Sequence, residues 1–140
     1  MTSNEFLQHL GSVSLFRACS DKELQAIARS VDEITLEEGR VLMTQGQTGH
    51  EAFVIVEGAA RADISGEHVA DFGPGDLVGA LSVIDGGERT ATITATTPLT
   101  VLVIHQPAFL GLMDEIPGLA RKVMVNLAGI VRSLDQVVYP

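Results

Sequence analysis

The chain has 140 residues, 46% of them hydrophobic, which suits one folded domain with a single core and excludes a largely disordered segment. Its 18 acidic residues outnumber 9 scattered basic ones and give a net charge of −9, so we expect no nucleic acid partner for this chain alone. The single cysteine, Cys19, excludes a disulfide framework and a zinc site built from cysteines. The sequence shows no signal peptide and no run of ~20 apolar residues, so we expect a cytoplasmic protein with no membrane partner.

The N-terminal part of the chain is predicted to be helical. A short helical segment over residues 4–10 comes first. Ser20 stands three residues before Glu23, the spacing of a capping box at a helix start. The apolar residues that follow recur at helical intervals: Leu24, Ile27, Ala28 and Val31. We therefore place a helical lead-in over about residues 4–31.

From about residue 32 the hydrophobic period changes to that of β-strands. Ile34 and Leu36 alternate with polar neighbours, and the later apolar runs are short and separated by glycines. The predicted strands are residues 41–44, 52–57, 59–65, 68–72, 90–97 and 99–105. Many short strands at near-regular spacing predict a closed or two-sheet antiparallel β-structure, a β-barrel over about residues 32–106.

The final part, about residues 107–138, is predicted to form two helices. Pro107 suits the first turn of one helix, and Pro117 precedes the longer one. Apolar residues in the longer helix repeat at alternating intervals of three and four: Ala120, Val123, Leu127, Ile130, Leu134 and Val137. A second apolar line runs beside them: Met124, Val131 and Val138. The repeat either covers the barrel with one broad face or also packs against a partner helix, as in a homodimer.

Residues 79–91 carry the chemistry that stands out in this sequence. Gly79 is predicted to open a helical segment that runs to Ile84, and a helix start presents free N–H groups to an anion. Arg89 follows Gly79 by ten residues, and its guanidinium suits the paired oxygens of a phosphate. Thr90 can add a hydroxyl and a backbone N–H. Together these groups predict a pocket for one small phosphate.

Other interpretations of these residues stay open. Arg89 could be a surface arginine paired with Glu88 or Asp85, and Gly79 could serve a simple turn. No glycine-rich dinucleotide or P-loop pattern accompanies them. We find no catalytic triad or paired-carboxylate pattern, so we expect no enzyme. The histidines lie far apart and form no metal-binding pattern: His9, His50, His68 and His105.

Two stretches resemble motifs of the cyclic nucleotide-binding domain family, which includes the catabolite activator protein, the regulatory subunits of cAMP-dependent kinase and cyclic-nucleotide-gated channels. Residues 79–83, followed after five residues by 89–95, resemble its phosphate-binding cassette, and residues 42–58 its first signature. The resemblance spans roughly residues 10–138. It implies one such domain over residues 1–140, with the fold of an antiparallel double-stranded β-helix, a jelly-roll-like barrel, between N-terminal helices and two C-terminal helices.

The resemblance also implies a ligand, cAMP or cGMP, and no cofactor. Arg89 would pair with the cyclic phosphate, and backbone N–H groups of residues 79–81 and of Thr90 would complete the anion site. The other implied ligand-binding residues come from the cassette, the barrel and the last helix: Gly79, Ala80, Leu81, Ala91, Val69, Phe72, and Ile130 or Leu134 closing over the base. Some relatives of this fold bind haem, which His68 or His105 would have to ligate here, or an iron–sulfur cluster, for which one cysteine is too few.

Ala80 departs from the family pattern. The family normally has glutamate there, whose carboxylate accepts a hydrogen bond from the ribose 2′-hydroxyl. Its loss would weaken binding by about 1.5–3 kcal/mol, or about ten- to a hundred-fold. Either binding is weaker, or another group serves the ribose, or the pocket has lost its ligand.

Two hypotheses therefore stand. The first is a regulatory module that transmits cAMP or cGMP occupancy through its C-terminal helices to an unidentified downstream protein. The second is an interaction or dimerisation module on the same fold with a degenerate pocket. The choice between cAMP and cGMP stays open.

Overall fold

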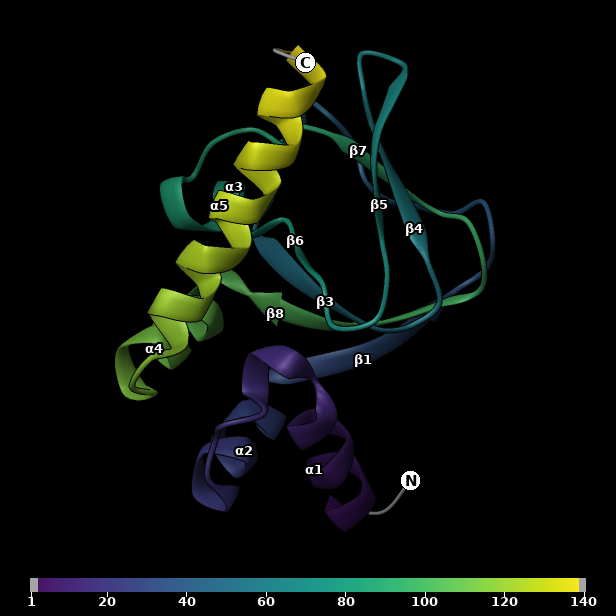
Figure 1. Cartoon of the computed structure of the whole chain (residues 1–140). Helices are drawn as coiled ribbons and strands as arrows, with labels where there is room; N and C mark the ends of the chain where they lie inside the picture. The colour runs from purple at the N-terminus through teal and green to yellow at the C-terminus, as the bar shows by residue number, and fades with distance from the viewer. Residues whose placement is uncertain (1–2, 139–140) are drawn as a thin grey trace.

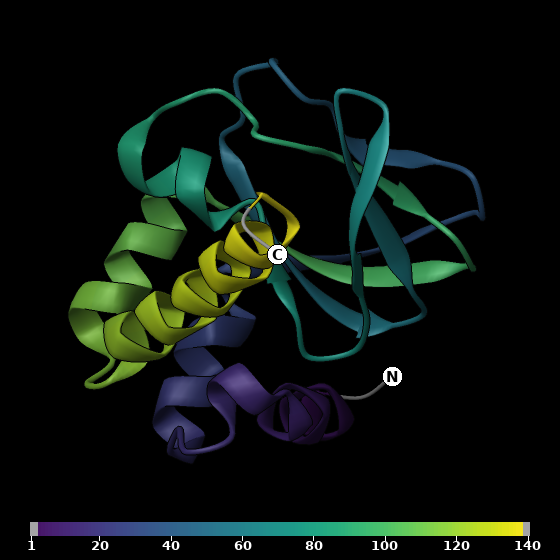
Figure 2. The ribbon, with the colours of Figure 1, turned by 45° about the horizontal axis from the view of Figure 1, so that its top comes forward.

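The computed structural model describes residues 3–138, and the side chains of residues 4–133. Two four-stranded antiparallel sheets form the β part of the molecule, and the helices gather along one side of it (Figures 1 and 2). The first sheet has the order β1-β8-β3-β6, that is Val31–Leu36, Leu99–His105, Glu51–Glu57 and Leu77–Val78. The second has the order β2-β7-β4-β5, that is Val41–Met43, Thr92–Ala95, Ala60–Ile64 and Glu67–Phe72. This confirms the predicted mainly β fold with flanking helices.

The first sheet is buried on both faces along its central strands. In β3, Phe53 and Ile55 join the cluster between the two sheets, whereas Ala52 and Val54 join the cluster under the helices. β8 divides in the same way, with Val101 and Val103 on the inner side and Leu102 and Ile104 on the outer side. Because successive strand residues face opposite sides, a strand covered on both sides is apolar throughout.

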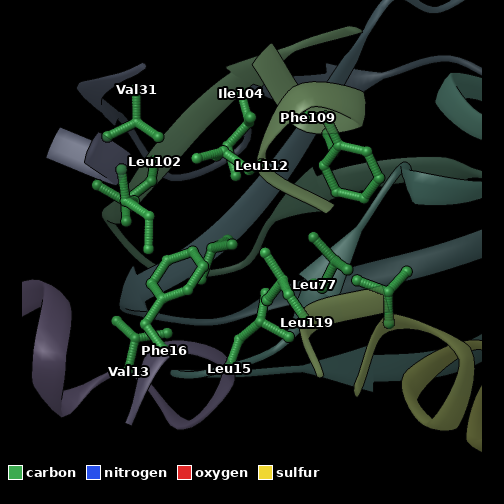
Figure 3. Close-up of a cluster of buried hydrophobic side chains, with 14 of the residues drawn as sticks. Val13, Leu15, Phe16, Val31, Leu77, Leu102, Ile104, Phe109, Leu112 and Leu119 are labelled. Atoms are coloured by element: carbon green, nitrogen blue, oxygen red, sulfur yellow. The ribbon is translucent and has the colours of Figure 1, made fainter. Parts of the chain in front are cut away.

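Three short helical elements cover the outer face of the first sheet: α1 (Ser3–Ser12), η1 (Ser14–Phe16) and α2 (Asp21–Ala28). The predicted capping box begins α2, because the Glu23 N–H donates to Ser20 Oγ over 3.2 Å and the Ser20 N–H donates to the Glu23 carboxylate over 2.8 Å. Side chains from the helices and the sheet, among them Phe16 and Leu102, meet in one buried cluster (Figure 3).

Three helices lie on the other side of this cluster: α3 (Ala80–Asp85), α4 (Gln106–Glu115) and α5 (Leu119–Val138). α3 connects β6 to β7 in the chain, and α4 follows β8 directly. α5 contacts η1, α3 and β5, so it runs from the helical side towards the barrel (Figure 1). Among the helices in the described part of the chain, none is both long and apolar enough to cross a bilayer.

The predicted strand over residues 90–97 is shorter in the structure. β7 occupies only Thr92–Ala95. Residues 90 and 91 precede the strand and lie beside the cavity described below. The apolar and β-branched composition of this stretch extended the prediction into the loop before β7.

The predicted apolar seam of the last helix is wrong at its first residue, Ala120. The helix begins at Leu119, which is buried, while Ala120 is exposed. Val123 is buried, and Leu127 packs against the same cluster, so this part of the seam covers the domain's own core. The predicted seam side chains of residues 134 and 137 lie outside the described side chains.

Candidate functional site

Arg89 is a buried arginine held by neutral oxygen atoms. Only 5% of its surface is exposed. Its Nη1 donates to the Gly79 carbonyl over 3.0 Å and to Ser82 Oγ over 2.7 Å, while Nη2 donates to the Glu51 carbonyl over 2.7 Å. The guanidinium carbon also lies 5.7 Å from the centre of the Phe53 ring. Strand β3, the start of α3 and the loop before β7 thus converge on one side chain.

The loop before β3 fixes the backbone of Arg89. The Arg89 N–H donates to the Gln47 carbonyl over 2.8 Å, and the Arg89 carbonyl accepts from the Gly46 N–H over 2.9 Å. Gly49 faces the guanidinium so closely that a Cβ atom there would overlap its Nε and Cζ atoms. Gly79 has φ +81°, and a Cβ atom at that position would lie 2.7 Å from Nη1. Both positions leave room for the arginine only because they are glycine.

The charge of Arg89 has no carboxylate partner within the described residues. None of the ion pairs there includes this arginine, so the alternative of a surface arginine paired with Glu88 or Asp85 is wrong. Burial lowers the pKa of Arg89, and the negative charge of Glu51 opposes that shift. Arginine stays protonated in proteins, so the site holds a desolvated positive charge that an anion would neutralise.

A cavity of about 520 Å³ lies beside Arg89, between β-strands, α3 and α5. Its size is that of a pocket for a small organic ligand. The structure brings these sequence-predicted residues to its wall: Gly79, Ala80, Leu81, Arg89, Thr90, Ala91, Val69, Phe72 and Ile130. Leu134, which was also predicted, lies outside the described side chains. The cavity therefore combines one buried cation with mainly apolar walls.

Several residues that the sequence analysis did not single out also belong to this site. Ser82 is buried; it accepts a hydrogen bond from Arg89, and its Oγ lies 3.3 Å from the Gly79 carbonyl, to which it donates. Glu51 contributes only its backbone carbonyl, which no sequence pattern reveals. Asn126 reaches the cavity from α5. Ser82 follows Gly79 by three residues, a spacing that places both on the same side of a helix. That spacing was the one sequence signal that could have placed Ser82 at the site.

The two histidines considered for haem do not line the cavity. His68 Nε2 lies 2.9 Å from an Asp71 carboxylate oxygen, and His105 Nε2 lies 3.6 Å from one of Asp32. Within the residues that the structure describes, no three histidine, cysteine or acidic side chains come together as a metal site. The chemistry of the site is thus that of a cation beside an apolar hollow.

Comparison with known sequences places these features in a family. The family model described as "cyclic nucleotide-binding domain" matches residues 33–115. The chain is 29% identical over 129 residues to a cyclic nucleotide-gated potassium channel of Mesorhizobium japonicum, covering 90% of this chain and 36% of the channel. It is 25% identical over 126 residues to the cyclic AMP receptor protein of Thermus thermophilus, covering 86% of this chain and 58% of the receptor protein. The chain thus spans less than two thirds of either relative.

A solved structure supports the same fold. The structure of cAMP-bound PfPKA-R matches with a TM-score of 0.87 at 18% identity, covering 98% of this chain and 48% of the other. At this identity the similarity concerns the fold alone. The family model, in contrast, matches more than half of the sequence and includes the loop from Gly79 to Arg89. The chain belongs to the cyclic nucleotide-binding domain family.

Proposed function

We propose that this domain is a regulatory module that binds cAMP or cGMP in the cavity beside Arg89. The observation that carries the proposal is a buried guanidinium with no carboxylate partner among the described residues, facing a hollow of about 520 Å³. A cyclic nucleotide offers a single negative charge for the arginine and the flat aromatic faces of its base for the mainly apolar walls. The relatives named for cyclic nucleotide gating and for cyclic AMP reception support this choice of ligand.

We further propose that α5 transmits occupancy of the cavity. Its first turns pack on the core through Leu119 and Val123, while Leu127 and Ile130 one and two turns later line the cavity. A ligand that contacts the second half would shift the position of the whole helix. The downstream partner is a separate protein or a further part of the same protein. The proposal includes no catalytic step, and it places the chain in the cytoplasm, where a single free cysteine such as Cys19 stays reduced.

The substitution Arg89→Ala tests the proposal. We expect it to weaken cAMP binding at least a hundred-fold, because a charge-assisted contact to the phosphate is lost in a buried site. Arg61→Ala is the matched control, since Arg61 pairs with Asp63 and does not line the cavity. Isothermal titration of both variants, with circular dichroism to confirm their fold, gives the comparison. Equal affinity for cAMP in Arg89→Ala and Arg61→Ala would contradict the proposal.

A second candidate function is a dimerisation module. The observation that favours it is the apolar surface that α5 leaves exposed, with Met124 exposed by 62%, and with Val125, exposed by 65%, and Val131, exposed by 55%, at the border of the cavity. Such side chains on one helix are typical of a protein–protein contact. In this alternative the buried Arg89 would be a remnant without a ligand.

A further inference from the structure

Ser82 is the one residue in the described part of the chain whose side chain accepts a hydrogen bond from Arg89. The Arg89 guanidinium makes three hydrogen bonds within the protein, and two of them end on the backbone carbonyls of Gly79 and Glu51. Every residue type has a backbone carbonyl, so those two acceptors do not depend on the side chains at their positions. The third acceptor, Ser82 Oγ, exists only because residue 82 carries a hydroxyl. The orientation of the guanidinium is therefore sensitive to the residue type at position 82.

The contact between Ser82 and Arg89 is short and buried. Nη1 lies 2.7 Å from Ser82 Oγ, whereas the hydroxyl donates to the Gly79 carbonyl over a longer 3.3 Å. A serine in a helix often donates to a carbonyl of the preceding turn, and that local bond alone would give Ser82 a structural role. A hydrogen bond from a charged donor is shorter and stronger than one between neutral groups. Because Ser82 is only 3% exposed, little water competes for its contact with the arginine.

The bonds to neutral oxygen atoms leave part of the guanidinium for a ligand. A guanidinium has five N–H groups, so three hydrogen bonds leave at least two N–H groups of Arg89 without an acceptor among the described residues. Arg89 and Ser82 both line the cavity. With Nη1 held against the start of α3, the planar guanidinium has little freedom to turn. An anion in the cavity then meets a side chain that is already ordered.

We propose that Ser82 is a positioning residue, whose hydroxyl holds the Arg89 guanidinium in the orientation that receives the anionic group of the bound nucleotide. This inference rests on the proposed function and adds a residue that acts on the ligand through Arg89. Without the hydroxyl, Nη1 keeps one acceptor, the Gly79 carbonyl, and the guanidinium can leave its position. Binding must then order a long side chain together with the ligand, which costs affinity.

The test is isothermal titration of the whole domain with cAMP. Ser82→Ala removes the hydroxyl, and Ser82→Cys keeps a side chain of similar size that is only a weak acceptor. We expect both substitutions to weaken cAMP binding about tenfold, the effect of one hydrogen bond to a charged group. Ser30→Ala is the matched control, because Ser30 Oγ donates to the Ala26 carbonyl over 2.9 Å and does not line the cavity. We expect this variant to bind cAMP as the wild type does.

A second measurement follows Arg89 itself in the absence of ligand. The nitrogen–proton NMR signal of the Arg89 Nε–H group, identified by its loss in Arg89→Ala, reports how well the guanidinium is ordered. We expect this signal to shift and broaden in Ser82→Ala and in Ser82→Cys, and to stay unchanged in Ser30→Ala. Urea unfolding of each variant measures the effect on stability separately.

The other outcomes would each overturn the inference. Wild-type affinity in Ser82→Ala would leave the serine a structural role, even if the free energy of unfolding falls. Weaker binding in Ser82→Ala but not in Ser82→Cys would show that side-chain size matters rather than the acceptor. Tighter binding would mean that the hydroxyl competes with the ligand for Arg89, and weaker binding with an unchanged Arg89 signal would mean that the hydroxyl contacts the ligand itself. No binding of cAMP to the wild type would overturn the proposed function as well, whereas the other results leave it intact.

Discussion

At the scale of single residues, the site depends on glycines as much as on its arginine. A buried guanidinium needs both space and hydrogen-bond acceptors. Here Gly49 and Gly79 leave the space, and the backbone carbonyls of Gly79 and Glu51 are acceptors. Three neutral acceptors orient the cation without cancelling its charge. The positive charge therefore remains available to an anionic ligand, which a salt bridge to a carboxylate would have prevented.

Gly49→Ala tests this arrangement without touching the arginine. Gly49 has an ordinary backbone conformation, so alanine strains only the contact with the Arg89 side chain. We expect about 1–3 kcal/mol of lost stability from overpacking and at least tenfold weaker cAMP binding, because the guanidinium must move. Gly73→Ala is the control, since a Cβ atom there meets nothing within 4 Å. Urea unfolding and titration measure the two effects, and unchanged affinity in Gly49→Ala would show that the guanidinium position is not critical.

At the scale of elements, α3 is a short helix fixed at both ends. Its start is held by Arg89 through the Gly79 carbonyl and Ser82 Oγ. Near its end, the Val83 carbonyl accepts from Gln106 Nε2 over 2.7 Å, which ties it to the first residue of α4. A six-residue helix is too short to be stable alone, so these tertiary contacts define it.

Gln106→Ala is expected to loosen α3. The buried Val83 carbonyl would lose its side-chain partner, which lowers the free energy of unfolding by about 1 kcal/mol. A looser α3 would also weaken cAMP binding, by about two- to fivefold. Gln25→Ala, on the exposed side of α2, removes an amide that has no such role. If thermal unfolding and titration give the same values for both variants, the link between α3 and α4 does not support the site.

The sequence predicted the elements well where one rule decided them. The capping box identified the start of α2, and uninterrupted apolar runs identified β3 and β8 to within one residue. The prediction failed where a residue fits the local hydrophobic pattern but is not buried in the folded domain. Ala120 fits a heptad yet faces solvent, because Leu119 takes the buried position at the helix start.

Some residues of the candidate site could likewise be predicted from the sequence, and others could not. Gly79, Arg89 and Thr90 could be singled out because their residue types and spacing resemble the phosphate-binding cassette of the family. The burial of Arg89 could not, since it follows from carbonyls and glycines on three separate segments. Nor could Asn126, which reaches the cavity only through the path of α5.

At the scale of the whole molecule, the two faces of α5 serve different roles. One side packs on the core and lines the cavity, and the exposed Val125 borders that cavity too, whereas the exposed Met124 does not line it. The chain carries a net charge of −9, which disfavours close approach of two copies unless an apolar contact compensates. A substitution at Met124 can therefore separate the proposed self-association from the proposed ligand binding.

Met124→Asp separates them. Met124 does not line the cavity, so we expect its substitution to leave cAMP affinity within about twofold of the wild type. If the exposed face of α5 forms a dimer, a charge there would dissociate it, and light scattering at high concentration would show monomers. Ile34→Asp, an exposed apolar position on β1, is the control. A wild-type chain that is already monomeric would contradict the dimerisation module.

We propose that Arg89, which is buried and has no carboxylate partner among the described residues, makes this cavity a cyclic nucleotide site. Isothermal titration of the wild-type domain with cAMP and with cGMP, at protein concentrations that detect millimolar binding, tests it most directly. We predict heat with one-to-one stoichiometry, and the tighter ligand identifies the preferred base. No heat from either nucleotide, with the fold verified by circular dichroism, would contradict the claim and leave the exposed face of α5 as the functional surface.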